Sequence, residues 1–343
     1  MTEPTASAGL RSEHARRLRC LRCAGALAVA SADTLECPEC CARYPVVDGT
    51  PRMLAPDARP PEEAAVAQRT ADSFAYEWAR FGDLREEWAK NFADYMRPHT
   101  PQSLAGKTIL DVGAGSGRHS FQAAAAGAQV VAVDLGDSID VARRNLPADV
   151  LTVQADAERL PFAPESFDLV MSIGVLHHLP DSERALSSLV RYVKPGGHLH
   201  VYLYWVPEQR WHRGVLALVT ALRRVTVRLP HRVLHVLCYP VAAALQLAVV
   251  APYRTLRGRK RSRRLAAALP LKTYADYPFG VLVNDQFDRF SAPLERRFTA
   301  AQVRTAMEQA GLQDIVVLAN HGWVADGRRP AAVGLADETP SSP

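Results

Sequence analysis

Two groups of residues in this sequence have types and spacings that could do chemistry. The first is a glycine-rich run at 113–117, which follows the apolar segment 108–112 and precedes a segment with helical spacing. Because glycine has no Cβ and tolerates positive φ, a ligand can approach the backbone of such a turn closely. The second is a pair of Cys-x-x-Cys motifs near the N-terminus, which could hold a metal ion.

Three aspartates strengthen the case for a ligand at the glycine run. Asp111 lies at the end of the apolar segment before it, and Asp134 and Asp156 lie at the ends of the next two predicted strands. Parallel strands end at one edge of a sheet, so Asp134 could accept hydrogen bonds from ribose hydroxyls and Asp156 from an adenine amino group. The dinucleotide-binding fingerprint needs glycine where this chain has Arg118. An empty turn, with Asp134 and Asp156 as helix N-caps or solvated turn residues, is the alternative.

The elements that must position these residues alternate in type from Lys107 onward. Predicted strands cover 108–112, 129–133, 151–154, 167–173 and 198–203, and predicted helices cover 118–126, 137–145 and 182–193. After a long insertion, a helix at 299–310 and a strand at 314–319 are predicted. This alternation predicts an α/β fold with a doubly wound, mainly parallel sheet.

This region resembles the class I S-adenosylmethionine-dependent methyltransferases, especially the small-molecule enzymes typified by ubiquinone and menaquinone methylation. The resemblance covers 107–204 well and 295–318 more loosely, and it depends on ordered motifs at 111–117, 134, 154–162, 167–170, 174–179 and 194–197. It implies a Rossmann-like fold and methyl transfer from S-adenosylmethionine to a small-molecule or lipid-linked acceptor, at an undetermined O, C or N atom. It also implies a set of cofactor-binding residues, namely Asp111, Gly113, Ala114, Gly115, Gly117, Asp134, Leu135, Asp156, Ala157 and Ser172.

On the acceptor side, His177 and His178 follow the fourth predicted strand. A histidine with a pKa near its ordinary value of about 6.5 could act as general base there, and a structural role at the loop-to-helix junction is the alternative. Residues 172–175 lack the Asn/Asp-Pro-Pro-Tyr/Phe motif of enzymes that methylate exocyclic base amines or glutamine amides, which argues against those acceptors. The segment 284–293 resembles a substrate-side segment of related zinc-ribbon methyltransferases, in which Asp285 and Arg289 could orient an acceptor. A well-bonded surface loop is the alternative.

The N-terminal cysteines are spaced to bind zinc. Two knuckles can place four thiolates tetrahedrally around Zn²⁺, and they would use Cys20, Cys23, Cys37 and Cys40. Together with 44–54, the motifs resemble the zinc-ribbon module found fused to, or partnering, methyltransferases. Cys41 stands where that module usually has glycine, so Cys41 could replace Cys40 as a ligand. Four thiolates would saturate the ion, which makes its role structural; a metal-free ribbon and redox chemistry are the alternatives.

Charge is concentrated in the insertion. The chain has a net charge of +5, and seven basic residues lie between Arg254 and Arg264, so the remaining 34 basic residues face 36 acidic ones. Val233–Tyr253 is apolar, with plausible breaks at His235, Pro240 and Gln246, and is borderline for the about 20 residues of a membrane span. The basic residues directly after it suit an anionic membrane surface. We interpret 205–290 as a helical lid over the substrate cleft, with peripheral membrane contact through 233–264 as an alternative and nucleic-acid contact less favoured.

The composition divides the chain into segments. We expect a disordered leader at 1–17, a zinc ribbon at 18–54, a linker and helical cap at 55–106, the cofactor-binding core at 107–204, the insertion with its basic run 254–264 at 205–290, the C-terminal part of the core at 291–328 and a disordered tail at 329–343. Since 1–17 lacks the apolar run of a signal peptide, we expect a cytoplasmic protein. Removal of 1–54 should leave a soluble cofactor-binding domain.

Two other function classes stay open. One is an RNA methyltransferase that uses the zinc ribbon and the basic run to bind phosphates. The other is a non-catalytic cofactor-binding partner of another enzyme.

Overall fold

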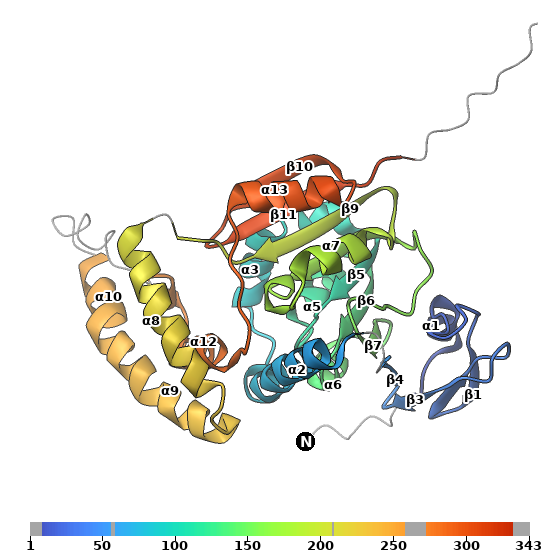
Figure 1. The fold of residues 1–343 in the computed structure, drawn as a ribbon, viewed down its shortest axis with the longest axis horizontal. Helices are drawn as coiled ribbons and strands as arrows, with labels where there is room; N and C mark the ends of the chain where they lie inside the picture. Colours follow the sequence, from blue (N-terminus) through green and yellow to red (C-terminus); the bar gives the residue numbers. More distant parts are fainter. Residues whose placement is uncertain (1–8, 56–58, 208, 258–271, 332–343) are drawn as a thin grey trace, which may run out of the picture.

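A central mixed sheet organises the chain in the computed structural model, which describes residues 9–55, 59–207, 209–257 and 272–331 (Figure 1). Five strands run parallel: β5 Thr108–Val112, β6 Gln129–Asp134, β7 Leu151–Ala155, β8 Phe167–Ile173 and β9 Val193–Leu203. Two more are antiparallel to their neighbours: β10 Gln313–Ala319 and β11 Trp323–Arg328. The order β7-β6-β5-β8-β9-β11-β10 confirms the predicted doubly wound α/β fold.

Each face of this sheet carries its own apolar core. Side chains alternate along β5, so Ile109 packs with the helices α5 (Arg118–Ala125) and α6 (Ser138–Asn145), while Leu110 belongs to the core under α7 (Ser182–Val190) and α13 (Ala300–Gln309). Both side chains are fully buried. This period-2 alternation fixes the register of β5 and therefore the position of the glycine run that follows it.

The sequence did not predict β11. Its residues include Asp326 and Gly327, which have low strand propensity, and the strand forms because β9 and β10 pair with it on both sides. β9 also begins earlier than predicted, at Val193, and runs through the motif at 194–197.

The N-terminal strands join the central sheet. They are β1 Ala28–Ser31, β2 Thr34–Glu36, β3 Arg43–Val47 and β4 Thr50–Met53. β4 pairs in parallel with β7, the Thr50 and Thr152 hydroxyl oxygens lie 2.7 Å apart, and Met53 is fully buried. Nothing in the sequence indicated this pairing. It changes the expected result of deleting 1–54, because the deletion would uncover an edge of the central sheet.

Part of the predicted disordered leader is helical. α1 (Ser12–Arg17) buries His14 and Ala15 against the fold, and the His14 ring nitrogen Nε2 lies 3.1 Å from the Asp149 carbonyl oxygen. Leader residues 1–8 and tail residues 332–343 lie outside the described part. At the other end of the fold, Arg329 is tied to the core by a hydrogen bond of 2.6 Å to the Val193 carbonyl.

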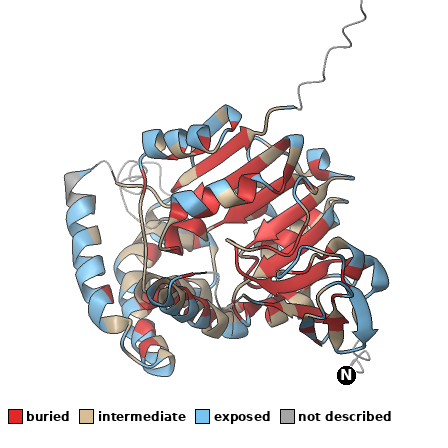
Figure 2. Cartoon of the chain, turned by 45° about the vertical axis from the view of Figure 1, so that its right-hand side comes forward, coloured by how far each residue is buried: buried red, intermediate tan, exposed pale blue. Residues whose placement is uncertain are grey.

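The helical cap and the insertion pack against each other. The cap comprises α2 Pro61–Phe81, α3 Glu87–Tyr95 and α4 Pro101–Leu104. The insertion comprises α8 Arg210–Thr226, α9 His231–Leu245, the π-helical turn η2 Gln246–Val250, α10 Ala251–Arg257, the 3-10 turn η4 Lys272–Asp276 and α12 Phe279–Ser291. α12 is the inner helix, in contact with α2, α8 and α9, and the insertion buries its own small core around Phe287. The buried sheet strands contrast with the largely exposed outer helices in Figure 2.

Two local expectations for the insertion were wrong. Pro240 does not break α9, and the helix continues to Arg257 through η2. The segment 284–293 is not a loop, because most of it belongs to α12. Of the basic run, 258–264 lies outside the described residues.

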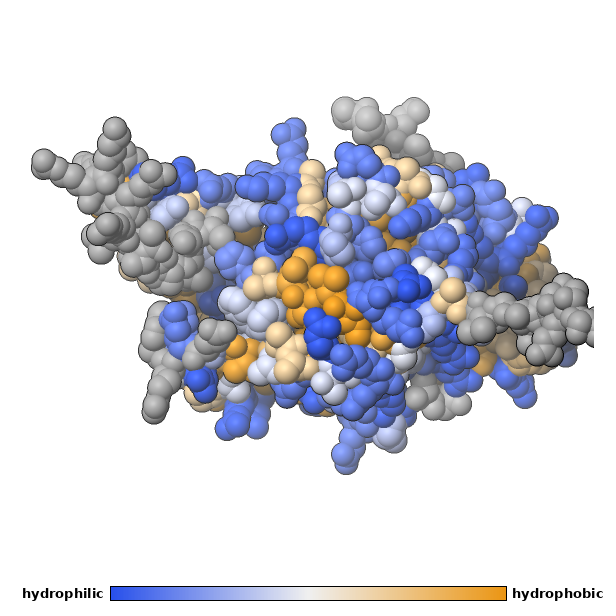
Figure 3. All heavy atoms as spheres, turned by 90° about the horizontal axis from the view of Figure 1, so that it is seen from above, coloured by the Kyte–Doolittle hydropathy of each residue, from blue (hydrophilic) through white to orange (hydrophobic). Residues whose placement is uncertain are grey.

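One helix, His231–Arg257, is long and apolar enough to cross a membrane, with 22% of its most apolar window buried inside the fold. The side of the molecule that carries β10 and α13 shows a hydrophobic patch near its centre, surrounded mainly by hydrophilic side chains (Figure 3).

Candidate functional site

The glycine run adopts the geometry expected of a ligand-binding turn. Gly113, Gly115 and Gly117 have φ of 82°, 56° and 80°, values that disfavour any residue with a Cβ. A Cβ on Gly113 would lie 2.2 Å from a Val175 methyl group, and one on Gly115 would lie 2.7 Å from the Trp78 indole nitrogen. The run therefore requires glycine, and α2 covers it through Trp78.

Asp111 is buried directly before the run. Its carboxylate accepts a hydrogen bond of 2.6 Å from the Ser120 hydroxyl at the start of α5. Burial raises its pKa to about 7, with the nearby Asp134 charge as a smaller cause. A carboxyl group with this pKa exists in both protonation states near neutral pH.

The Asp134 carboxylate fixes the glycine run by hydrogen bonds. One carboxylate oxygen accepts the Gly115 N–H at 2.9 Å, and the other accepts the Gly136 N–H at 2.9 Å and the Ser138 hydroxyl at 2.7 Å. Burial raises its pKa. A carboxylate has about four lone-pair sites, so with three in use one site stays available for a ligand's hydroxyl group.

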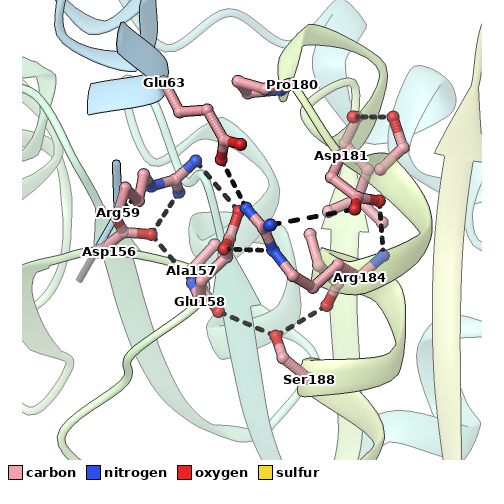
Figure 4. Close-up of polar contacts among 12 residues, drawn as sticks. Arg59, Glu63, Asp156, Ala157, Glu158, Pro180, Asp181, Arg184 and Ser188 are labelled. Carbon is pink, nitrogen blue, oxygen red and sulfur yellow. Dashed lines mark hydrogen bonds and ion pairs between the residues drawn. The ribbon is translucent and has the colours of Figure 1, made fainter. Parts of the chain in front are cut away.

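Asp156 is engaged by a residue that the sequence did not predict, Arg59 (Figure 4). The Arg59 guanidinium is buried and forks onto both carboxylate oxygens of Asp156, with its Nε 2.6 Å from Oδ2, and its Nη1 lies 3.0 Å from Glu158. Arg184 of α7 reaches Glu158 from the other side at 2.9 Å and Glu63 of α2 at 2.6 Å. This network ties the start of α2 to the end of β7.

The remaining predicted cofactor residues lie around the same edge of the sheet. Ser172 is buried, and its hydroxyl donates to the Val112 carbonyl at 3.0 Å, which joins β8 to β5. The Leu135 carbonyl accepts from the Gln154 amide at 3.1 Å. Ala114 and Ala157 are buried beside the glycine run and the Asp156 turn. The structure thus brings all the predicted cofactor residues to one edge.

His177 and His178 form the 3-10 turn η1 (Leu176–His178) at this edge. His177 is fully buried and stacks on Tyr204 with ring centroids 3.9 Å apart; neither ring nitrogen has a hydrogen-bond partner among the described residues. Burial and the neighbouring His178 hold its pKa well below the ordinary value. His178 differs, because its Nδ1 lies 2.7 Å from the Leu294 carbonyl, which fixes that nitrogen as the donor and leaves Nε2 as the proton acceptor.

Three carboxyl groups converge between α2 and α12. Glu77 is 2% exposed, and burial and the nearby Asp288 raise its pKa well above the ordinary value. Burial raises the pKa of Asp285 to about 6, and the Tyr274 hydroxyl donates to that carboxylate. Asp288 accepts from Tyr204 at 3.3 Å. This acidic cluster (Glu77, Asp285 and Asp288) offers carboxyl oxygens that could bind a polar ligand.

Sequence reasoning missed Arg59 and Glu77 for different reasons. Arg59 lies in the proline-rich linker, where no periodicity marks it. Glu77 had a visible signal, because it lies three residues after Phe74 and four before Phe81, on the apolar side of the predicted helix. A carboxyl group in a buried stripe is costly and therefore marks a candidate site.

The four predicted metal ligands lie together. The sulfur atoms of Cys20, Cys23, Cys37 and Cys40 all lie within 4.8 Å of one another, with Cys20 to Cys40 at 3.5 Å and Cys23 to Cys37 at 3.4 Å. Tetrahedral zinc with Zn–S bonds of about 2.3 Å needs sulfur separations of roughly 3.8 Å, so this donor set fits the ion. Cys41 is outside the group and exposed, with φ of 57°, which explains why glycine suits that position.

The central part of the chain matches a known family. Residues 110–201 match the family model of the methyltransferase domain. A demethylmenaquinone methyltransferase of Clavibacter sepedonicus is 40% identical over 107 residues, which cover 30% of this chain and 44% of that protein. A ubiquinone biosynthesis O-methyltransferase of Coxiella burnetii is 34% identical over 139 residues, which cover 36% of this chain and 59% of that protein. The chain spans about half the length of these curated relatives.

Among solved structures, human N-acetylserotonin methyltransferase in complex with S-adenosylmethionine is 15% identical, with a TM-score of 0.45 over 80% of this chain and 61% of that chain.

Proposed function

We propose that this protein is an S-adenosylmethionine-dependent methyltransferase that acts on a small-molecule or lipid-linked acceptor. The observation that carries the proposal is the convergence of the glycine run, Asp111, Asp134 and Asp156 at one sheet edge, inside a segment that matches the methyltransferase domain. The relatives' quinone-related names favour the same substrate class. No finding supports the RNA or the non-catalytic alternative.

The residues present fit the cofactor. The Gly113–Gly117 backbone and Asp111 would hold its methionine part, Asp134 its ribose, and Asp156 with Ala157 its adenine, where Arg59 would share the Asp156 carboxylate. The bound cofactor supplies an activated methyl group on a sulfonium. The protein then has to orient the acceptor in line with that methyl group and exclude water; α2 and its Trp78 cover the loop in a way that serves both needs.

The acceptor side lies between η1, α2 and α12. If the acceptor must lose a proton, His178 is the better base of the two histidines, because the Leu294 carbonyl orients its free Nε2 and His177 is held neutral by burial. The acidic cluster would bind polar groups of the acceptor. With the acceptor in hand, His178→Gln should lower kcat by about 10²-fold or more. An unchanged kcat would exclude His178 as the base.

The direct test is transfer of a labelled methyl group. Purified full-length protein is incubated with methyl-labelled cofactor and separate fractions of lipids, small metabolites and RNA. Label in the lipid or small-metabolite fraction supports the proposal. Label confined to RNA, or in no fraction although the cofactor binds, contradicts it.

We also propose that the ribbon binds one structural Zn²⁺ through Cys20, Cys23, Cys37 and Cys40. The support is the donor set itself: four thiols within 4.8 Å of one another in a unit with little core of its own. A saturated site would have no catalytic role.

We further propose that the long helix His231–Arg257 lies on an anionic membrane surface. One face of the long helix is buried against α12 through Leu234 and Ala242, so this helix suits the interface better than a span. Its opposite face exposes Val236 (66%) and Leu247 (73%). Basic residues at 254–264 follow directly, which complements anionic lipid.

Vesicle flotation tests this surface. The wild type should float with phosphatidylglycerol-containing vesicles and much less with pure phosphatidylcholine. The double variant Val236→Gln, Leu247→Gln should lose most of the binding. The control Val47→Gln, on the exposed face of β3, should not. Equal binding by all three proteins would contradict a membrane role for this face.

A further inference from the structure

A second cluster of ligating side chains lies away from the cofactor loop and has no role in the proposed function. It comprises His99, in the turn between α3 and α4, His198 and His200 on β9, and Asp326 on β11. His200 and Asp326 are paired neighbours across the two strands. Nitrogen and oxygen ligand atoms of His99, His200 and Asp326 all lie within 4.8 Å of one another.

The tautomer of His200 is fixed by a backbone contact. Its Nε2 lies 2.8 Å from the Tyr95 carbonyl oxygen, which can only accept, so Nε2 carries the hydrogen. In neutral His200 the lone pair of Nδ1 then points at Asp326 Oδ1, 3.4 Å away. Two acceptors that face each other repel, and a cation between them, either a proton on Nδ1 or a metal ion, would remove this repulsion. Asp326 Oδ1 also lies 2.7 Å from His99 Nε2.

The surroundings favour the metal ion. A proton on Nδ1 would join only His200 to Asp326, whereas a metal ion could bind His99, His200 and Asp326 together, since their ligand atoms all lie within 4.8 Å of one another and the rings of His99 and His200 lie 5.6 Å apart. A metal-binding histidine commonly donates its other ring N–H to a backbone carbonyl, as His200 does to Tyr95. Two imidazoles and a carboxylate, with ligand bonds of about 2.0–2.2 Å, are a donor set that zinc and its neighbours accept.

We propose that His99, His200 and Asp326 form a second metal site, which binds a divalent transition ion such as Zn²⁺. His198 lies at its more exposed rim, with Nδ1 2.8 Å from the second Asp326 oxygen, and is the candidate fourth ligand. The ion would fasten the end of α3 to β9 and β11. Through Tyr95, whose ring packs on Tyr202 at 4.6 Å, it would position the helical cap beside the acceptor side.

Zinc content of variants tests the site. Full-length wild type, Asp326→Asn and His99→Gln are loaded with Zn²⁺, freed of unbound ion by gel filtration and assayed for zinc per chain. Each variant should hold one ion less than the wild type, whatever the ribbon holds. The control Asp314→Asn, an exposed carboxylate on the neighbouring strand, should match the wild type. Equal zinc in the wild type and both variants would overturn the proposal and leave a proton-linked cluster.

A cobalt titration of the wild type tests the site even if the variants fail to fold. Co²⁺ bound by the ribbon thiolates gives intense sulfur-to-metal charge-transfer bands, whereas Co²⁺ on imidazole and carboxylate gives only weak visible bands. Titration of the wild type should therefore show a second uptake phase without charge-transfer intensity. A single phase, in which all absorption follows the thiolate bands, would overturn the proposal.

Discussion

Replacing Asp134 with asparagine separates the two roles that the structure gives this carboxylate. Asparagine keeps one oxygen for the Gly136 N–H and the Ser138 hydroxyl, but it places an amide donor opposite the Gly115 N–H. The loop loses one hydrogen bond to a charged group, worth about 1.5–3 kcal/mol. The variant also removes a buried carboxylate, whose pKa is raised by burial, and this offsets part of that cost. We therefore expect the free energy of unfolding to change by about 1 kcal/mol or less.

Cofactor affinity should fall much further than stability. The ribose hydroxyls would lose one charged acceptor and keep a weaker neutral one, a loss of about 3 kcal/mol. At about 1.4 kcal/mol per tenfold, the dissociation constant of S-adenosylmethionine should rise roughly a hundredfold. Isothermal titration calorimetry measures this constant, and thermal melting checks the fold.

Asp137→Asn is the matched control. Its carboxylate is exposed, lies in the same turn and accepts only from the Gln154 amide among the described contacts, at 3.2 Å. The dissociation constant should stay within about twofold, since exposed polar contacts contribute little. If Asp134→Asn binds the cofactor as tightly as the control does, the assignment of Asp134 to the ribose is wrong.

Three further predictions concern pH, the sheet edge and the ribbon. The pKa of Asp111 is about 7 in the folded chain and about 3.9 unfolded, so its contribution to the free energy of unfolding should fall as pH rises from about 4 to 7 and level off above. Asp111→Asn should remove about 1.4 kcal/mol per pH unit from the slope of the unfolding free energy against pH in this range. An unchanged slope would refute the raised pKa of Asp111. Deletion of 1–54 should give an aggregating protein, because β7 loses its partner β4, and a monodisperse product in light scattering would disprove the shared core. Cys37→Ser should release the ribbon zinc and lower the Tm by several degrees, whereas Cys41→Ser should keep the zinc, as metal analysis would report.

The cofactor side of the fold was predictable because its signals are local. Each strand that carries a site residue, such as β5 before Gly113 or β6 ending at Asp134, combines a short apolar run with a glycine or an acid at its end. Parallel strands then bring these ends together without further information.

The missed features depend on contacts between distant segments. Arg59 is 97 positions from Asp156, and Arg52 on β4 pairs with Gln154 on β7 across 102 positions. No local pattern encodes such pairings. The insertion was predicted to be helical, but the polar residues of 284–293, among them Asp285 and Asp288, left a surface loop open. In the structure they belong to α12 and lie near Glu77 of α2, where burial overrides their low helix propensity.

Hydrogen exchange of the full chain with and without S-adenosylhomocysteine, the demethylated product of the cofactor, tests the central claim most directly. Backbone amides that a ligand covers exchange more slowly. The account predicts slower exchange in three separate peptides, around 113–118, 134–138 and 156–158, and little change in the ribbon strands β1 and β2. Binding without protection at these three segments, or protection of only one of them, would contradict a single cofactor site built from the ends of β5, β6 and β7.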